Sequence, residues 1–141
     1  MSLVFWDTML FIYWLEDHPE HAGRVRSIFE RMQERGDVLA TSAFTIGEIL
    51  VAPCRKKDQA MVDRIQSMFK QPFVTVLPFT ADTATRYARI RAGMKVSPAD
   101  AIQLACAAEA GVDVFLTNDR ELAGRHVPGI QFVARMDIPL F

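Results

Sequence analysis

Short apolar runs alternate with amphipathic segments along the whole chain. The apolar runs predict strands at residues 3–6, 38–41, 73–77 and 112–116, with a candidate fifth strand at 131–133. Apolar residues spaced for one buried helical face predict helices at 9–16, 19–35, 43–53, 58–69, 80–91 and 98–110. Strands separated by helices are typical of a parallel sheet covered on both faces. The pattern therefore predicts an α/β fold with three layers, α/β/α, around a mostly parallel sheet of four to five strands.

Several helix ends carry their own signals. Ser42 is a candidate N-cap for the helix that ends near Pro53. Ser97 and Pro98 form the start of the last predicted helix, and Gly36 and Gly111 are expected to stop the helices that precede them. These signals predict where the helices begin and end, and therefore which polar side chains lie at their ends.

Composition limits the kind of protein. With 141 residues, half of them hydrophobic, and no repeat or linker-like stretch, residues 1–141 are expected to form a single domain with one core. No apolar run approaches the ~20 residues of a membrane span, and a strand predicted next to Met1 leaves no room for a signal peptide. A cytoplasmic protein is expected, without a disulfide between Cys54 and Cys106.

Four acidic residues stand out because each lies where an apolar segment ends or on an apolar helix. Asp7 closes the first strand and Asp119 follows the fourth, so both are expected at the sheet edge where open α/β folds bind ligands. Glu48 lies on the apolar helix after the second strand, and Asp100 lies in the first turn of the helix capped by Ser97. Folding is therefore expected to gather the four acids into one site.

A cluster of this kind requires a cation, because neighbouring carboxylates raise each other's pKa. Oxygen ligands suit hard divalent ions such as Mg²⁺, which keeps several waters. Zinc is disfavoured because His18, His21 and His126 stand in no ligand spacing with one another or with a cysteine. The residues thus indicate a divalent-metal site made of carboxylates.

Each acid also has an ordinary structural alternative. Asp7 could cap the first helix, Asp100 could complete a capping box, and Asp119 could cap the turn that follows it. Glu48 could pair with a buried arginine; left unpaired on its apolar helix, its charge would be costly or neutralised. The sequence leaves these alternatives open.

Four segments, each carrying one of these acids, resemble the acidic motifs of the PIN-domain family. They are Trp6-Asp7-Thr8, residues 41–49, residues 97–105 and residues 116–120, and they occur in the family's order. Within that family the chain resembles, from end to end, the compact VapC-type toxins of prokaryotic toxin–antitoxin pairs. The resemblance implies a Mg²⁺- or Mn²⁺-dependent ribonuclease that hydrolyses RNA phosphodiester bonds.

The resemblance also assigns roles to residues. It implies a catalytic and metal-binding quartet of Asp7, Glu48, Asp100 and Asp119. It further implies that Thr8, Thr117 and Asn118 support the metal or its waters. Met9 departs from the small polar residue that the family often has after Asp-Thr, which puts one supporting contact in doubt.

Substrate contacts are harder to assign. The net charge of −1 and the pI of about 6.3 argue against binding nucleic acid by bulk electrostatics alone. Arg120, beside Asp119, is the first candidate phosphate contact, followed by Lys56 and Lys57, for which solvated surface is the ordinary alternative.

Partners follow from composition and from the resemblance. The aromatic-rich early helices, with Phe11, Tyr13, Trp14, Phe29 and Met32, predict an exposed patch and a homodimer, although core packing explains these residues equally well. VapC-type resemblance implies an antitoxin whose C-terminal segment blocks the acidic cleft.

Three other functions compete with a toxin ribonuclease. A phosphoacceptor switch also places acids at strand ends, but it usually needs a tandem acidic pair early and a lysine late near the site, whereas here the first strand offers one acid and Arg120 is the late cation near the site. A catalytically silent PIN-like binding module would lack part of the quartet, which is complete here. A free-standing PIN-domain nuclease that processes RNA remains the nearest alternative.

Overall fold

The computed structural model describes residues 1–139 and contains every predicted element. Within these residues the strands are β1 (Leu3–Trp6), β2 (Val38–Ser42), β3 (Val74–Leu77), β4 (Val114–Thr117) and β5 (Phe132–Arg135). The helices are α1 (Thr8–Leu15), α2 (Ala22–Arg35), α3 (Ala43–Arg55), α4 (Gln59–Phe69), α5 (Ala81–Gly93) and α6 (Pro98–Ala110).

The five strands form one parallel sheet in the order β3-β2-β1-β4-β5. β1 is central: Phe5 pairs with Ala40 of β2 on one side and with Phe115 of β4 on the other. All strands therefore end at the same edge, so the residues that follow β1 and β4 emerge side by side. The predicted sheet is confirmed, and its candidate fifth strand is present.

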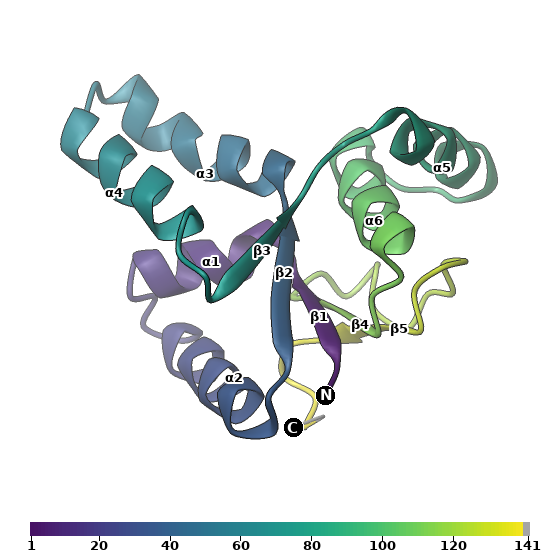
Figure 1. The fold of residues 1–141 in the computed structure, drawn as a ribbon, viewed down its shortest axis with the longest axis horizontal. Helices are drawn as coiled ribbons and strands as arrows, with labels where there is room; N and C mark the ends of the chain where they lie inside the picture. The colour runs from purple at the N-terminus through teal and green to yellow at the C-terminus, as the bar shows by residue number, and fades with distance from the viewer. Residues whose placement is uncertain (140–141) are drawn as a thin grey trace.

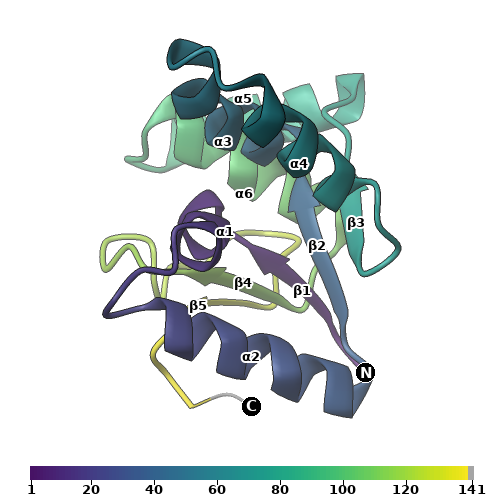
Figure 2. The same cartoon turned by 90° about the vertical axis from the view of Figure 1, so that its left-hand side faces the viewer.

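Helices cover both faces of the sheet. Figure 1 shows α1, α2 and the α3–α4 pair on one side and α5 and α6 on the other. Successive residues of β1 serve different layers: Val4 and Trp6 belong to the core beneath α1 and α2, whereas Phe5 belongs to the core beneath α6. In the view turned by 90°, α2 lies along the sheet below α1 (Figure 2). The predicted three-layer α/β/α class is confirmed.

The core on the α1–α2 side is aromatic. Trp6 contacts Phe11, Trp14 and Phe29, with ring centroids 5.2, 5.9 and 6.2 Å apart. Phe11 is fully buried, and Trp14 and Phe29 are partly buried against the same core. The prediction that these residues form an exposed patch is therefore wrong, because they pack on one another around Trp6.

The core on the other face combines alanines of α6 with larger apolar side chains. α6 presents Ala101, Ala105 and Ala108, all buried, to a sheet whose Phe5 and Phe115 rings stack at 4.9 Å. Leu104 of α6 is fully buried in the same core, so α6 packs closely against the sheet through short alanine side chains beside these larger ones. This close approach brings polar side chains of α6 within reach of the residues that end β1 and β2.

Most predicted helix ends are confirmed. Gly36 and Gly111 end α2 and α6 with φ of 73° and 66°, in the left-handed region that glycine adopts at little cost. The Ser42 side chain accepts a hydrogen bond from the Thr45 amide, and Pro98 occupies the first turn of α6.

The start of α2 and the end of α3 differ from the prediction for identifiable reasons. α2 begins at Ala22 rather than residue 19, because His18 Nδ1 accepts hydrogen bonds from the Glu20 and His21 amides and holds residues 19–21 in a turn. α3 continues to Arg55, with Pro53 inside its last turn, so proline does not end it. No helix among residues 1–139 is long and apolar enough to cross a membrane.

Candidate active site

One pocket of about 410 Å³ collects all four acids. Asp7 follows β1, Glu48 projects from α3, Asp100 lies in the first turn of α6, and Asp119 follows β4. Among the described residues that line this pocket there is no Lys, Arg or His. The acidic pocket thus concentrates negative charge with no basic side chain in its wall.

Asp7 is the most buried member. Its Oδ1 accepts a hydrogen bond from the Thr8 amide at 2.8 Å, so it does cap α1 as the structural alternative supposed. Burial raises the pKa of Asp7 from 3.8 to about 6, with smaller contributions from the charges of Asp100 and Glu48. A carboxyl group with this pKa is half protonated in mildly acidic solution unless a cation stabilises its charge.

Thr117 joins the two strand-end acids. Its hydroxyl donates to Asp7 Oδ2 at 2.9 Å and accepts from the Asp119 amide at 3.0 Å. The side chain is fully buried at the end of β4. Because one hydroxyl contacts both acids, Asp7 is oriented by a residue of the neighbouring strand β4. The hydrogen bond from Thr117 also lowers the pKa of Asp7, which partly opposes the effect of burial.

Glu48 is half-buried and held from α1. Thr8 Oγ1 donates to Glu48 Oε1 at 2.5 Å, across 40 residues of sequence. Within residues 1–139 no Lys or Arg forms an ion pair with Glu48, so the alternative of a buried Glu–Arg pair is wrong. Its charge faces the pocket instead.

Gln103 lies beneath Thr8 and Glu48 and is 2% exposed. Its Nε2 donates to Thr8 Oγ1 at 2.9 Å and to Thr45 Oγ1 at 2.7 Å, and its Oε1 accepts from the Ser42 hydroxyl. One amide thus connects α1, α3 and the end of β2. No role for Gln103 was predicted from the sequence. A polar side chain three residues after Asp100, in an alanine-rich helix, was the feature that could have indicated one.

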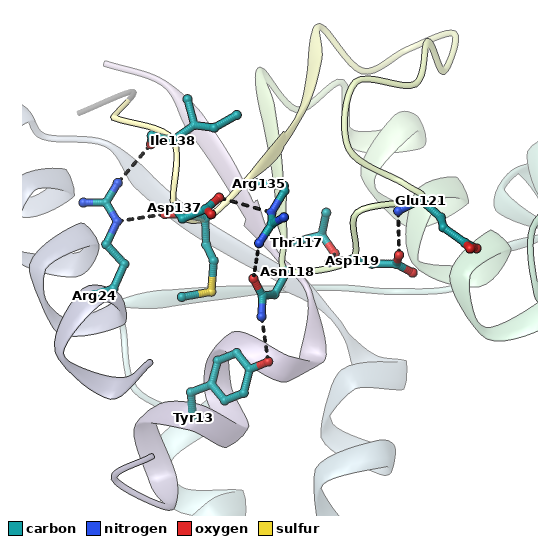
Figure 3. A network of polar contacts seen from close by, with 10 residues as sticks. Tyr13, Arg24, Thr117, Asn118, Asp119, Glu121, Arg135, Asp137 and Ile138 are labelled. Carbon is teal, nitrogen blue, oxygen red and sulfur yellow. Dashed lines mark hydrogen bonds and ion pairs between the residues drawn. The ribbon is translucent and has the colours of Figure 1, made fainter. Parts of the chain in front are cut away.

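Asp119 is exposed, and Asp100 is less buried than Asp7. Ser97 Oγ accepts from the Asp100 amide at 3.1 Å and caps α6. Burial raises the pKa of Asp100, and the neighbouring charge of Asp119 raises it further, while Ser97 opposes the shift. Asp119 Oδ1 accepts from the Glu121 amide at 2.8 Å, so it caps the following turn (Figure 3).

Asn118 is fixed by side chains on either side of it. Its Nδ2 donates to the Tyr13 hydroxyl at 3.0 Å, and its Oδ1 accepts from Arg135 Nη2 at 3.4 Å (Figure 3). Arg135 also lies 3.1 Å from the Asp137 carboxylate. Tyr13, whose role in the site the sequence prediction missed, lines the acidic pocket beside Asn118.

The predicted phosphate contacts lie outside this pocket. Arg120 is exposed beside Asp119 and does not line the acidic pocket. Lys56 lines a separate hollow on the far side of Glu48, and Lys57 is exposed. Met9, the departure from the PIN-domain motif, is 41% exposed and does line the pocket.

The donor chemistry of the pocket fits a hard divalent cation. Four carboxylates, together with hydroxyl and amide oxygens, offer only oxygen ligands, and no basic side chain lines the described pocket to neutralise them. No three of the described His, Cys, Asp and Glu side chains are gathered closely enough to ligate one ion on their own. Mg²⁺ commonly uses one or two carboxylates and retains waters, so the arrangement suits an ion bound partly through water.

The sequence matches a known protein family over most of its length. The family model described as the PIN domain matches residues 4–125, which is most of the chain. No curated protein matches the sequence.

Solved structures share the fold over nearly their full length. VapBC2 from Rickettsia felis, bound to a promoter DNA fragment, is 14% identical, with 94% of this chain and 98% of that chain covered and a TM-score of 0.74. A toxin–antitoxin complex from Klebsiella pneumoniae is 21% identical, with coverages of 92% and 95% and a TM-score of 0.67. VapC20 from Mycobacterium tuberculosis, a toxin that cleaves the sarcin-ricin loop, is 18% identical, with coverages of 79% and 86% and a TM-score of 0.62. At these identities the likeness is one of fold.

Proposed function

The chain belongs to the PIN-domain family, and from this premise we propose that it is a divalent-metal-dependent endoribonuclease that hydrolyses RNA phosphodiester bonds. The observation that carries the proposal is the acidic pocket, in which four carboxylates from four elements meet with no basic side chain in the described wall. In this proposal residues 1–141 form a single nuclease domain.

The metal would be Mg²⁺ or Mn²⁺, held by Asp7, Glu48, Asp100 and Asp119 with water completing its coordination. When bound, such an ion acidifies a water molecule and neutralises charge on the phosphate that is attacked. The four carboxylates would orient the ion and keep the site negative enough to retain it.

The chain's other polar side chains orient these carboxylates. Thr117 fixes the Asp7 carboxyl through a 2.9 Å hydrogen bond, and Thr8 fixes Glu48. Gln103 in turn fixes Thr8 from below. Asn118, whose amide is engaged by Tyr13 and Arg135, would act as a positioning residue for the wall of the pocket.

The test is cleavage of a labelled, mixed-sequence single-stranded RNA. Wild-type protein is expected to cut it with Mg²⁺ or Mn²⁺ and to stop when EDTA is added. Asp7→Asn is expected to fold and to lose cleavage, whereas Asp63→Asn, at an exposed acid of α4, should cut as the wild type does. Cleavage that survives both EDTA and Asp7→Asn would overturn the proposal.

We further propose that the protein is the toxin of a toxin–antitoxin pair, with RNA as substrate and an antitoxin as partner. This is supported by the shared fold with the VapBC2 complex and the Klebsiella pneumoniae toxin–antitoxin complex. The antitoxin's C-terminal segment would enter the acidic pocket and place a basic side chain among the carboxylates. Co-expression with the product of the adjacent small reading frame should block RNA cleavage and restore growth.

Two alternatives to this proposal predict different results. A free-standing RNA-processing nuclease would cut RNA without having an adjacent inhibitor gene. A catalytically silent PIN-like module would bind RNA or protein without cutting RNA in the presence of any metal ion.

We also propose that the protein forms a homodimer. Light scattering after size-exclusion chromatography tests this, and a monomer mass would exclude it.

A further inference from the structure

We propose that the RNA strand leaves the acidic pocket along the loop between α5 and α6, over a basic track formed by Lys95, Arg125, Arg89 and Arg86. The partner of this surface is the phosphate backbone of RNA on one side of the bond that is cut. The inference rests on the proposed nuclease function and adds the direction in which the substrate runs.

The first support is continuity of the surface. Asp100 and Asp119 line both the acidic pocket and a neighbouring hollow of about 280 Å³, which Lys95 also lines. Lys95 then borders a third hollow of about 390 Å³, together with Arg125 and His126. Because each hollow shares residues with the next, the surface leads without interruption from the carboxylates to the loop.

The third hollow opens into a fourth, of about 330 Å³, on the α5 side. They share Gly93, Met94 and His126. The fourth hollow adds the side chains of Arg86 and Arg89 from α5. The track therefore passes from the start of α6 to the surface of α5, which lies beside α6 (Figure 1).

The second support is charge. The two hollows farthest from the acidic pocket are lined by two arginines of α5, by Lys95 and by Arg125, with no acid among their described lining residues. Arg86 is paired with Glu109 behind it, so the net positive charge comes from Arg89, Lys95 and Arg125, for which the described residues show no ion pair. Nearer the pocket, Glu121 lines the hollow that also contains Lys95. The charge along the track thus changes from negative at the acidic pocket to positive at the farther hollows. This positive charge attracts the phosphate backbone of an RNA strand that leaves the pocket.

The opposite flank of the acidic pocket has the reverse character. The hollow of about 260 Å³ beyond Glu48 is lined mainly by apolar side chains, with Glu16, Glu48 and Asp58 against the single cation Lys56. Three acids and one lysine disfavour a phosphate chain on this side. The RNA strand is therefore expected to leave the acidic pocket on the α5–α6 side and not on the α3–α4 side.

The third support is that the loop is held in place. Arg125 Nη1 donates to the Lys95 carbonyl at 3.3 Å, which joins the loop after β4 to the loop before α6. Arg86 pairs with Glu109 at 2.5 Å, and Gly129, with φ of 98°, lies so close that an added Cβ would be 2.9 Å from Arg86 Nη1. The side chains of Arg86 and Arg125 are therefore held in place before RNA binds, so less ordering is needed at these two positions.

The far end of the track suits an unstacked base. Ile90, Met94 and Pro128 supply an apolar wall, and Arg86 and Arg89 line the same hollow. RNA-binding proteins commonly hold single-stranded bases by apolar or guanidinium stacking while cations hold the phosphates. A single strand, rather than a duplex, is the form of RNA that fits.

The experiment measures RNA binding in an Asp7→Asn background, with Mg²⁺, so that the probe stays intact. The probe is a fluorescent single-stranded RNA of mixed sequence, and its Kd is measured over a range of salt concentrations. Lys95→Gln with Arg89→Gln removes two exposed cations for which the described residues show no ion pair. This double variant is expected to bind about tenfold more weakly and to lower the salt slope by about 1.4, or about 0.7 per lost phosphate contact.

The matched control is Lys70→Gln with Arg64→Gln, one lysine and one arginine exposed at α4. Its Kd and salt slope are expected to equal those of the background protein. A second comparison, Lys56→Gln with Lys57→Gln, examines the opposite flank. Equal losses in all three variants, or a larger loss at Lys56 and Lys57, would overturn the track.

The outcomes also separate this inference from the nuclease proposal. If the unmutated protein neither cuts nor binds RNA, the proposed function fails and the track fails with it. If it cuts RNA and the Lys95–Arg89 variant binds and cuts normally, only the track fails. If that variant binds RNA normally but loses binding to poly-glutamate, the surface instead belongs to an acidic protein segment.

Discussion

Asp7 and Glu48, the inner pair of the acidic pocket, are held by side chains from distant parts of the sequence, whereas Asp100 and Asp119, the outer pair, are held by near neighbours in the chain. Thr117 reaches Asp7 across 110 residues, and Thr8 reaches Glu48 across 40. The outer acids are held through Ser97 and Glu121, within three residues of each. The inner pair is therefore fixed by the fold itself, while the outer pair is free to adjust when a cation or a phosphate binds.

The largest expected effect separates the two pairs by activity. Asp7→Asn should lower kcat/KM for RNA by about 10³-fold, because it removes a charged ligand from the rigid half of the site. Asp119→Asn should lower it by only about 10-fold, since solvent and the remaining acids can compensate at the exposed position. Single-turnover cleavage over a range of Mg²⁺ concentrations measures both. Equal losses would contradict the distinction between inner and outer pairs.

The second effect concerns stability and pH without metal. The folded protein holds the Asp7 proton with a pKa of about 6, against 3.8 for the ordinary group, so this contribution to stability is complete below pH 3.8 and is lost as the pH rises through 6. A shift of this size corresponds to about 3 kcal/mol. Urea unfolding in EDTA should show stability falling between pH 4 and pH 7.

Two variants show whether Asp7 causes that loss. Asp7→Asn should remove most of the fall between pH 4 and pH 7, whereas Asp119→Asn should leave it in place because Asp119 is exposed. Added Mg²⁺ should restore stability at pH 7 in the wild type but not in Asp7→Asn. A pH profile that is the same for wild type and Asp7→Asn would contradict the assignment.

The third effect tests the support under the inner pair. Gln103→Leu removes one hydrogen-bond partner from each of the hydroxyls of Ser42, Thr8 and Thr45 and should lower the unfolding free energy by about 2 kcal/mol. It should also lower kcat about 10- to 100-fold and raise the Mg²⁺ needed for half-maximal rate. Gln33→Leu, at an exposed position on α2, is the matched control. Reduced stability with an unchanged Mg²⁺ requirement would show that Gln103 serves the core alone.

The smallest effect belongs to the outer pair. Ser97→Ala removes the N-cap of α6 and should cost about 1 kcal/mol of stability. Because Asp100 follows in the first turn, the variant should change the Mg²⁺ requirement only slightly. Thermal unfolding and a Mg²⁺ titration provide the two readouts. A change in Mg²⁺ requirement as large as that of Gln103→Leu would place Ser97 among the supports of the rigid half.

The sequence allowed the quartet to be predicted because parallel strands and helix starts place residues by rules of chain geometry. Asp7 and Asp119 follow strands that pair directly, so their proximity needs no knowledge of side-chain packing. Gln103 could not be assigned in the same way, because its partners depend on how closely the alanine face of α6 approaches the sheet. The basic track was also missed, since Lys95 and Arg125 meet only through the packing of two loops.

The central position of β1 has a consequence for the timing of assembly during synthesis. β1 leaves the ribosome before its neighbour β4, and the Thr117 hydroxyl that orients Asp7 follows Asp7 by 110 residues. Because chains emerge from the N-terminus at about 5–20 residues per second, a nascent chain carries Asp7 for seconds without its partner. The acidic pocket is therefore completed only after β4 and Asp119 have emerged, so a nascent chain that has not reached residue 119 lacks the assembled set of four carboxylates.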